Sequence, residues 1–533
     1  MPSRRFSFSP ANLALIVAMS AAALAITTRI EAQRPSAARV GPANQGPRLP
    51  QQQSGNPAEG REVFRFETFG NEGFWTDAVR LPAGIEAARV TPLQALQLGL
   101  QVDSDRVDAR TKAQLARELA ADPSGRSSRL LNDPAVTGKL VMAGAVIGMS
   151  PKGGKVGASC ALCHTLTDAS VMRVPQGGSI GRRVDGRANH FLQVGKIFAT
   201  AANTRALYTV AQTQLTANKG KTLGRAPRGL TENSSEAEFD AYFSNPTFYP
   251  VGMFDDTFDG NGNPMHNTPM FEQNLAAPYG SEGTITKQED FANLVYTTLF
   301  DQTMLTTPGG RQFVHKLAGP AGDEMIADYV KILRDTGVRG YPYVNRQARR
   351  VGRVGELASP IGFRVDNRKL LAMNAYVFSL RAPFGVVTDR AAVTRGRASF
   401  IQSGCTTCHN NNQARPVPTT LHPMTRIWPA DRPMFLAPRT PPLSPVQDTP
   451  GTFDDKWVVV NASLRGEKRG VSMPFLLGLA TKPAFLHDDS VRSLDSLLDP
   501  RRGARAPHPF YLGNPRRRAD MVAYLRALDT RSR

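Results

Sequence analysis

Two short stretches of this sequence, CALCH at residues 160–164 and CTTCH at residues 405–409, share the pattern C-x-x-C-H. In this pattern two thiols three positions apart can each add to a vinyl group of one porphyrin, and the following histidine can give an imidazole nitrogen to the iron. The alternatives are a chance match, or a C-x-x-C pair that serves redox chemistry or binds zinc. All four cysteines of the chain lie in these motifs, so none is left for a disulfide or a zinc site. The sequence therefore predicts two covalently attached haem c groups.

The two motifs assign roles to six residues. The cysteine thiols hold the porphyrins, and each motif histidine is the proximal ligand of its iron. The predicted set is Cys160, Cys163 and His164 in the first motif and Cys405, Cys408 and His409 in the second. The distal ligands must come from elsewhere in the chain.

The composition is that of a globular protein with a strong positive charge. The chain has 533 residues, 41% of them hydrophobic and 21% charged, which predicts two to four domains. Its formal net charge is +20, and about four haem propionates would lower this to roughly +16. A basic surface can dock an acidic redox protein, an anionic membrane surface or nucleic acid. The haem motifs favour an acidic redox partner protein, and no stretch resembles a nucleic-acid-binding module.

The N-terminal residues are typical of an export signal. In residues 1–32, Arg4 and Arg5 precede an apolar run, Ala14 to Ile26, and Ala32 offers a cleavage point. The alternative is an uncleaved membrane anchor, but the run is short for a bilayer span. Residues 33–60 are rich in Pro, Gly, Gln and Ala and are predicted to be a flexible leader. We therefore expect a periplasmic or secreted protein with no membrane span after cleavage.

The order of helix, C-x-x-C-H, irregular loops and closing helix occurs twice. It predicts a mainly α fold with an N-terminal haem domain at residues 61–340, a connector at 341–385 and a C-terminal domain at 386–533. Helix periodicity and capping signals place the individual helices. The expected helices cover residues 92–98, 112–121, 134–149, 236–243, 286–300, 323–333, 369–380, 391–401 and 518–528, the fourth and fifth beginning with capping boxes at Ser235 and Thr286.

Parts of the chain resemble known haem proteins. The run TRGRASFIQSGCTTCHN at residues 394–410 looks like the first helix and haem motif of a class I cytochrome c domain. The run MPFLLGLATKPAFLHDDSVRSLDSLLDP at residues 473–500 is similar to a segment of bacterial dihaem c-type proteins, a group that includes dihaem cytochrome c peroxidases, the methylamine-utilisation dihaem enzyme and secreted dihaem rubber oxygenases. NEGFWTD, GASCALCHTLTD and IGRRVDGRANHFLQVGKI look like an uncharacterised branch of dihaem cytochromes. The resemblance implies two cytochrome c-like domains.

The segment departs from the family pattern at two positions. Leu477 stands where the family has arginine, and Asp489 stands where it has glycine. The resemblance therefore implies family membership without carrying catalytic activity over to this chain.

The distal ligands decide between electron transfer and catalysis. A haem with two strong axial ligands transfers electrons, whereas an open face can bind peroxide or oxygen. For the second haem the resemblance favours His487, which would make a low-potential bis-histidine centre, although this histidine could instead be structural. The other candidates for the second haem are Met473, His422 and Met424. The candidates for the first haem are Met253, Met265, His266, Met270 and His190.

These observations lead to three functional hypotheses. The first is a periplasmic or secreted dihaem c-type cytochrome that passes electrons between protein partners. The second is a dihaem peroxidase or oxygenase whose N-terminal haem is the reactive centre, which would follow if that haem has no distal ligand. The third is a binding protein stabilised by haem but without redox turnover.

Overall fold

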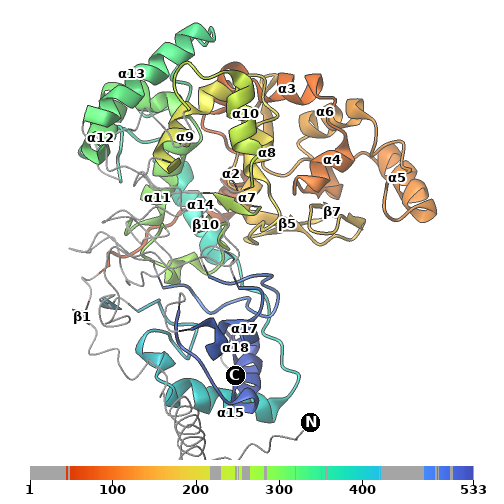
Figure 1. The fold of residues 1–533 in the computed structure, drawn as a ribbon, viewed down its shortest axis with the longest axis vertical. Helices are drawn as coiled ribbons and strands as arrows, with labels where there is room; N and C mark the ends of the chain where they lie inside the picture. The colour runs from red at the N-terminus through yellow and green to blue at the C-terminus, as the bar shows by residue number, and fades with distance from the viewer. Residues whose placement is uncertain are drawn as a thin grey trace, which may run out of the picture.

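The computed structural model describes residues 44–45, 49–215, 230–421 and 473–531, with short gaps at 247–248, 250, 255–264, 281–284, 319, 350, 355–357, 419, 487–488, 490 and 504–507. Within these ranges helices joined by irregular loops dominate, and the strands form only sheets of two or three short members (Figure 1). The predicted mainly α class is confirmed at this level. The predicted export signal, residues 1–32, lies outside the described residues. None of the helices in the described ranges is both long and apolar enough to cross a membrane.

One pair of helices supports the first motif. α2 (Pro57–Phe66) packs along α14 (Asn367–Ser379) near the centre of the molecule (Figure 1). A Cβ atom at Gly60 would lie 1.9 Å from the carbonyl oxygen of Ala372, so the two backbones touch at a position that only glycine allows. α14 falls inside residues 341–385, the segment predicted to be a connector.

A second pair of helices is built in the same way. α15 (Arg390–Gln402) packs along α18 (Pro515–Ala527), and both lie with α17 (Leu494–Leu497) at the lower end of the molecule in Figure 1. A Cβ atom at Gly396 would lie 2.0 Å from the carbonyl oxygen of Asp520. The shared core includes Phe400, Leu494, Leu512, Met521, Tyr524 and Leu525. Each C-x-x-C-H motif is therefore accompanied by a helix pair that crosses at a glycine.

A β-hairpin leads the chain into the first motif. The helix predicted over residues 134–149 is wrong in its second half, because α6 (Pro134–Met142) ends early and a glycine with φ of 65° follows its cap. The chain then forms β3 (Met149–Lys152) and β4 (Lys155–Ala158), joined by two glycines with φ of 56° and 77°. Positive φ at both turn residues suits a tight hairpin. α7 (Ala161–His164) follows directly.

Two predicted helix starts are confirmed. α4 (Pro92–Gln97) begins after Thr91, and α10 (Glu236–Ser244) begins after Ser235. In both, the hydroxyl of the cap residue accepts a hydrogen bond from the third amide of the helix, while the side chain of that third residue bonds back to the cap amide. These reciprocal bonds satisfy backbone amides that would otherwise lack partners.

The third predicted capping box, at Thr286, is wrong. α11 (Gln288–Leu294) has Lys287 at its N-cap and no side-chain hydrogen bond there. The helix continues as η6 (Val295–Leu299), a π-helical turn that ends it before residue 300. Such turns insert one extra residue and redirect the side chains that follow. This one carries Tyr296, which reaches the first motif.

The remaining elements complete the core around these parts. β7 (Ser179–Gly181) pairs in parallel with β2 (Val102–Asp103) and antiparallel with β6 (Met172–Arg173). The other strand pairs are antiparallel: β5 (Thr165–Thr167) with β8 (Arg183–Asp185), β9 (Met253–Phe254) with β10 (Met265–His266), and β1 (Asn44–Gln45) with β11 (Thr420–Leu421). The predicted helices near 112–121 and 323–333 correspond to α5 and α13. The bounds of the remaining helices are η2 (Phe74–Ala78), α3 (Leu81–Ala87), η3 (Ser104–Arg106), α5 (Ala109–Ala121), α8 (Val194–Phe198), η4 (Thr204–Leu207), α9 (Tyr208–Leu215), η5 (Gln273–Leu275), η7 (Gln302–Thr306), α12 (Pro308–Ala318), α13 (Pro320–Asp335), η8 (Cys405–Thr407) and η10 (Pro500–Arg502).

Candidate functional site

The first motif occupies a single helical turn between two apolar cores. α7 places Cys160 and Cys163 three positions apart, so both thiols lie on one side of the turn. Cys160 packs against the core shared by α2 and α14, and Cys163 packs against the larger core of the N-terminal half. Just before the turn, the Ser159 hydroxyl donates a hydrogen bond to the carbonyl oxygen of Arg65 at the end of α2 (2.8 Å). The α2–α14 pair therefore fixes the position of the motif.

The imidazole of His164 is oriented by a backbone carbonyl. Its Nδ1 lies 2.7 Å from the carbonyl oxygen of Thr268. A carbonyl oxygen only accepts, so Nδ1 carries the proton and Nε2 keeps its lone pair. Burial lowers the pKa of His164 to about 4, which keeps the ring neutral at physiological pH. This is the arrangement by which proteins commonly orient a histidine that binds a metal through its other nitrogen.

Two further side chains reach the first motif that sequence reasoning did not find. The Tyr296 hydroxyl lies 3.4 Å from Sγ of Cys160 and donates a hydrogen bond to the carbonyl oxygen of Glu67 (3.1 Å). Sδ of Met373, on α14, lies 3.8 Å from the same sulfur. These contacts span 136 and 213 positions in the sequence, so no local pattern could indicate them.

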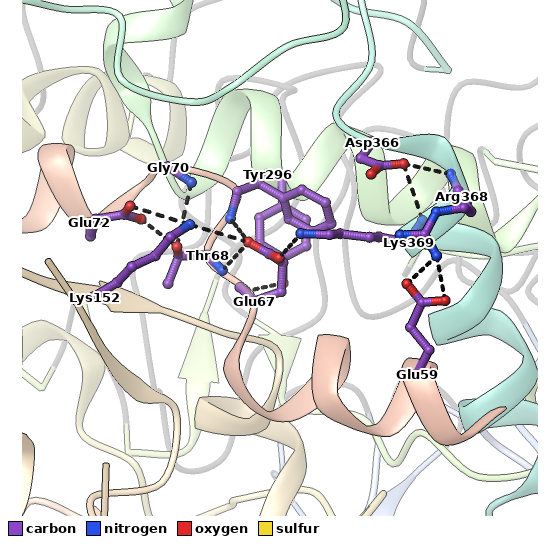
Figure 2. A network of polar contacts seen from close by, with 11 residues as sticks. Glu59, Glu67, Thr68, Gly70, Glu72, Lys152, Tyr296, Asp366, Arg368 and Lys369 are labelled. Carbon is purple, nitrogen blue, oxygen red and sulfur yellow. Dashed lines mark hydrogen bonds and ion pairs between the residues drawn. The ribbon is translucent and has the colours of Figure 1, made fainter. Parts of the chain in front are cut away.

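A network of charged groups ties the end of α2 to α14 (Figure 2). The Glu67 carboxylate forms an ion pair with Lys369 of α14 and accepts a hydrogen bond from the backbone amide of Phe69 (2.9 Å). Lys152 lies 3.8 Å from the same carboxylate. Burial by itself would raise the pKa of Glu67, but the hydrogen bonds from Lys369 and Phe69, and the charges of the two lysines, outweigh it and hold the pKa below its ordinary value.

This network makes part of the stability depend on pH. Glu67→Gln is expected to lower the free energy of unfolding at pH 7 by about 1–3 kcal/mol, because Lys369 loses its charged acceptor. A carboxyl group with a lowered pKa in the folded state contributes stability above its unfolded pKa, near 4, and loses it as the pH falls through the folded pKa. The variant and the parent should therefore converge in strongly acidic buffer.

Urea denaturation at pH 7 and at successively lower pH measures this difference. Glu62→Gln is the matched control, since Glu62 lies on the same helix with an exposed side chain and pairs only with its neighbour Arg61 among the described contacts. It should change little at either pH. A Glu67 effect that is as large in acid as at neutrality would contradict the assignment.

His190 and His266, the two histidines predicted as distal candidates for the first haem, both lie beside the carboxylate of Asp489. Nδ1 of His190 donates to Oδ2 of Asp489 (3.0 Å), and Nδ1 of His266 lies 3.8 Å from the other oxygen. The two rings stack with centroids 5.2 Å apart, and Nζ of Lys482 donates to Nε2 of His266 (3.0 Å). Asp489, which replaces the glycine of the resembling segment, keeps the left-handed backbone that suits glycine (φ 52°).

This cluster joins the C-terminal half to the segment that orients His164. Asp489 and Lys482 come from the run of residues 473–500, while His266 ends β10, shortly before Thr268. Burial by itself would raise the pKa of Asp489, but the hydrogen bond from His190 and the positive charge of Lys482 hold it below its ordinary value. The cluster thus helps to position the carbonyl group that His164 contacts.

The methionine candidates for the first haem lie around the same segment. Met270 is buried in the core beside Cys160, and its backbone amide donates to the carbonyl oxygen of Gly186 (2.9 Å). Met253 and Met265 lie on the paired strands β9 and β10, and only the backbone of these two residues is described. The distal ligand of the first haem stays a prediction.

The second motif follows α15 directly. Gly404, with φ of 76°, precedes η8. The His409 amide donates a hydrogen bond to the carbonyl oxygen of Cys405 (2.9 Å). Cys405 packs on the core of α15 and α18, and Cys408 packs beside Met473 in a small apolar cluster. His487, His422 and Met424 lie outside the described residues, so ligation by His487 stays a prediction.

A different histidine lies opposite His409. The ring centroids of His409 and His508 are 6.3 Å apart, with the ring planes inclined at 49°. Nδ1 of His508 is buried and has no hydrogen-bond partner among the residues that the structure describes. No motif in the sequence singles out His508, and only its place in the folded chain indicates it.

The four thiols differ from those of redox-active C-x-x-C pairs. Burial raises the pKa of Cys160 and Cys405 to about 11. It raises the pKa of Cys163 and Cys408 to about 12, with a smaller contribution from the neighbouring cysteine of each motif. Redox-active pairs have a thiol whose pKa is lowered below the ordinary value. In the described part of the chain, the two motifs included, no group of three or more His, Cys, Asp or Glu side chains is arranged to hold a metal ion.

Comparisons with known proteins identify no family. No protein-family model matches the chain, and no curated protein matches it. A solved structure of hydrazine synthase from Kuenenia stuttgartiensis, pressurised with 20 bar xenon, aligns with 61% of this chain and 87% of its own at 12% sequence identity. The TM-score of 0.26 is too low for this likeness to support an argument about fold or function.

Proposed function

We propose that this protein is a dihaem c-type cytochrome of the periplasm or the secreted fraction, which transfers electrons between protein partners. One haem c would be attached through Cys160 and Cys163, and the other through Cys405 and Cys408. His164 and His409 would be the proximal ligands. Bound haem supplies an iron that alternates between the ferric and ferrous states.

The observation that carries this proposal is the setting of His164. Two thiols on one side of a helical turn are followed by an imidazole whose Nδ1 is held by the Thr268 carbonyl group, with Nε2 left as the nitrogen that can bind iron. A redox C-x-x-C pair gives no reason for an oriented histidine directly after the second cysteine. The donor set of the first motif therefore fits a haem.

The arrangement around the two motifs supports the same proposal. Each motif lies beside a pair of helices that cross at a glycine, Gly60 in the first pair and Gly396 in the second. The two halves share this arrangement although their connections differ. A long segment separates α2 from the first motif, whereas α15 leads directly into the second motif. Two similar supports are expected if both motifs hold the same kind of group. The net charge of +20 would orient an acidic partner protein on approach.

A second function, peroxidase or oxygenase chemistry at the first haem, is favoured by one observation. Two of the five candidate distal ligands, His190 and His266, contact Asp489 and Lys482. His266 also lies two positions before Thr268, the residue whose carbonyl oxygen contacts Nδ1 of His164. If no other residue binds the iron, the first haem has an open face.

Spectroscopy of the purified protein separates these functions. We expect a pyridine haemochrome assay to give two covalent haems per chain. For electron transfer, absorption and electron paramagnetic resonance spectra should show two low-spin haems that do not change with peroxide, cyanide or carbon monoxide. One high-spin haem that binds these ligands would support the enzyme instead. Fewer than two covalent haems would contradict the proposal as a whole.

A further inference from the structure

We infer that His508 is the distal ligand of the iron that His409 would bind, an inference that rests on the proposed attachment of haem at the second motif. The two rings have centroids 6.3 Å apart. Two imidazoles bound to one metal ion from opposite sides, each at about 2 Å, hold their ring centres about 6 Å apart. The separation of the two histidines therefore suits a shared iron.

The surroundings of His508 leave one of its nitrogens unsatisfied. Nδ1 is buried without a hydrogen-bond partner in the described ranges, while the ring packs edge-on against Phe510 with centroids 5.1 Å apart. A buried imidazole nitrogen without a partner is unfavourable, and most such groups in folded proteins are paired. A bond to a metal ion is one way to satisfy an imidazole nitrogen, which makes this ring unlike an ordinary structural histidine.

The backbone around His508 holds it in a strained conformation. His508 has φ of 52°, in the left-handed region that side chains other than glycine seldom adopt. Its carbonyl oxygen accepts hydrogen bonds from the Phe510 amide (2.8 Å) and from Nη1 of Arg502 (3.5 Å), and the same guanidinium nitrogen also donates to the Leu497 carbonyl oxygen (3.1 Å). Strained residues of this kind persist where the surrounding structure fixes them, often at ligand-binding sites.

The neighbouring contacts fix this loop between two helices. The Tyr511 hydroxyl donates to the Gly503 carbonyl oxygen (2.6 Å), and the Leu512 amide donates to the Leu498 carbonyl oxygen (3.0 Å). Residues 508–512 are therefore held beside the ends of α17 and η10, and α18, which begins shortly after them, packs on α15, the helix that leads into the second motif. His508 and His409 are thus positioned by the same helix pair, as two ligands of one metal should be.

Four other residues are candidates for this role. His487, which the family resemblance favours, lies outside the described residues, as do His422 and Met424. Met473 is buried beside Cys408, at the edge of the motif, in a cluster with Val417. Of the described candidates, His508 is the one whose ring lies within ligation range of the His409 ring.

The test is a set of single variants of the full haem-loaded protein: His508→Ala, His508→Met, Met473→Leu and His487→Ala. Each is examined by pyridine haemochrome assay and by absorption and electron paramagnetic resonance spectra. We expect His508→Ala to keep two covalent haems and to convert one of them from low spin to high spin. Added imidazole should restore the low-spin spectrum by binding the vacated axial position. His508→Met should show the near-infrared charge-transfer band of methionine ligation.

The outcomes distinguish the inference from the function on which it rests. Met473→Leu and His487→Ala should leave the spin states unchanged. If His508→Ala retains two low-spin haems, or if His487→Ala or Met473→Leu is the variant that becomes high spin, then His508 is not the ligand. If the unsubstituted protein lacks a haem at the second motif, the proposed function itself fails there.

Discussion

Gly60→Ala is expected to lower the free energy of unfolding by about 3 kcal/mol, although alanine is the better helix former. The added Cβ would lie 1.9 Å from the Ala372 carbonyl oxygen and 2.5 Å from its carbon. Neither atom belongs to a flexible side chain, so α2 and α14 must move apart along their shared face. Because α2 also supports the first motif, the packing around Cys160 would loosen with it. Urea denaturation followed by circular dichroism measures the loss.

Gly138→Ala is the matched control for this prediction. Gly138 lies inside α6, and a Cβ there would meet no atom within 4 Å. The same substitution should therefore stabilise the protein by about 0.5–1 kcal/mol, through helix propensity alone. Gly396→Ala, at the crossing of α15 and α18, should destabilise as Gly60→Ala does. Equal effects of the same sign at Gly60 and Gly138 would show that the helix crossing does not require glycine.

Replacing both cysteines of one motif is expected to reduce the covalent haem content from two to one per chain. Cys160→Ser with Cys163→Ser removes the first attachment, and Cys405→Ser with Cys408→Ser removes the second. Serine keeps nearly the size of cysteine, but its hydroxyl cannot form the thioether bond. Pyridine haemochrome assays and haem staining of denaturing gels measure the covalently bound fraction.

The two double variants serve as controls for each other. All four cysteines belong to the motifs, so neither variant changes any other thiol. The variant without the first attachment should keep the spectrum of the haem at His409, and the other should keep that of the haem at His164. Two covalent haems remaining after either double substitution would exclude attachment through that motif.

Local signals allowed much of the helical framework to be predicted from the sequence. Thr91 and Ser235 begin their helices as predicted, because a capping bond depends only on residues within one turn. Two helix boundaries were predicted wrongly, because the backbone conformation there does not follow the capping and periodicity signals of the sequence. The helix from Pro134 stops early at a glycine with positive φ, and at Thr286 the cap position passed to the next residue.

The sequence was least informative about what surrounds the motifs. The spacing of Cys160 and His164 predicts a shared role for them, whereas Tyr296 and the Thr268 carbonyl group reach them only through the tertiary fold. His508 is a similar case, since a single histidine in a loop carries no pattern of its own. Family resemblance favours His487 instead, and because this residue lies outside the described ranges its ligation stays a prediction.

The pairing of α2 with α14 also affects the order in which the chain folds and its thiols are modified. Glu59 on α2 forms an ion pair with Arg368 on α14, 309 positions later. Until the chain through residue 379 has been synthesised, α2 lacks its partner helix, and the apolar core that packs against Cys160 is incomplete. Once the pair closes, Cys160 and Cys163 are half-buried, and desolvation raises the pKa of both thiols, which makes them weaker nucleophiles. Covalent modification of Cys160 and Cys163 is therefore expected to be faster before this helix pair closes than after it.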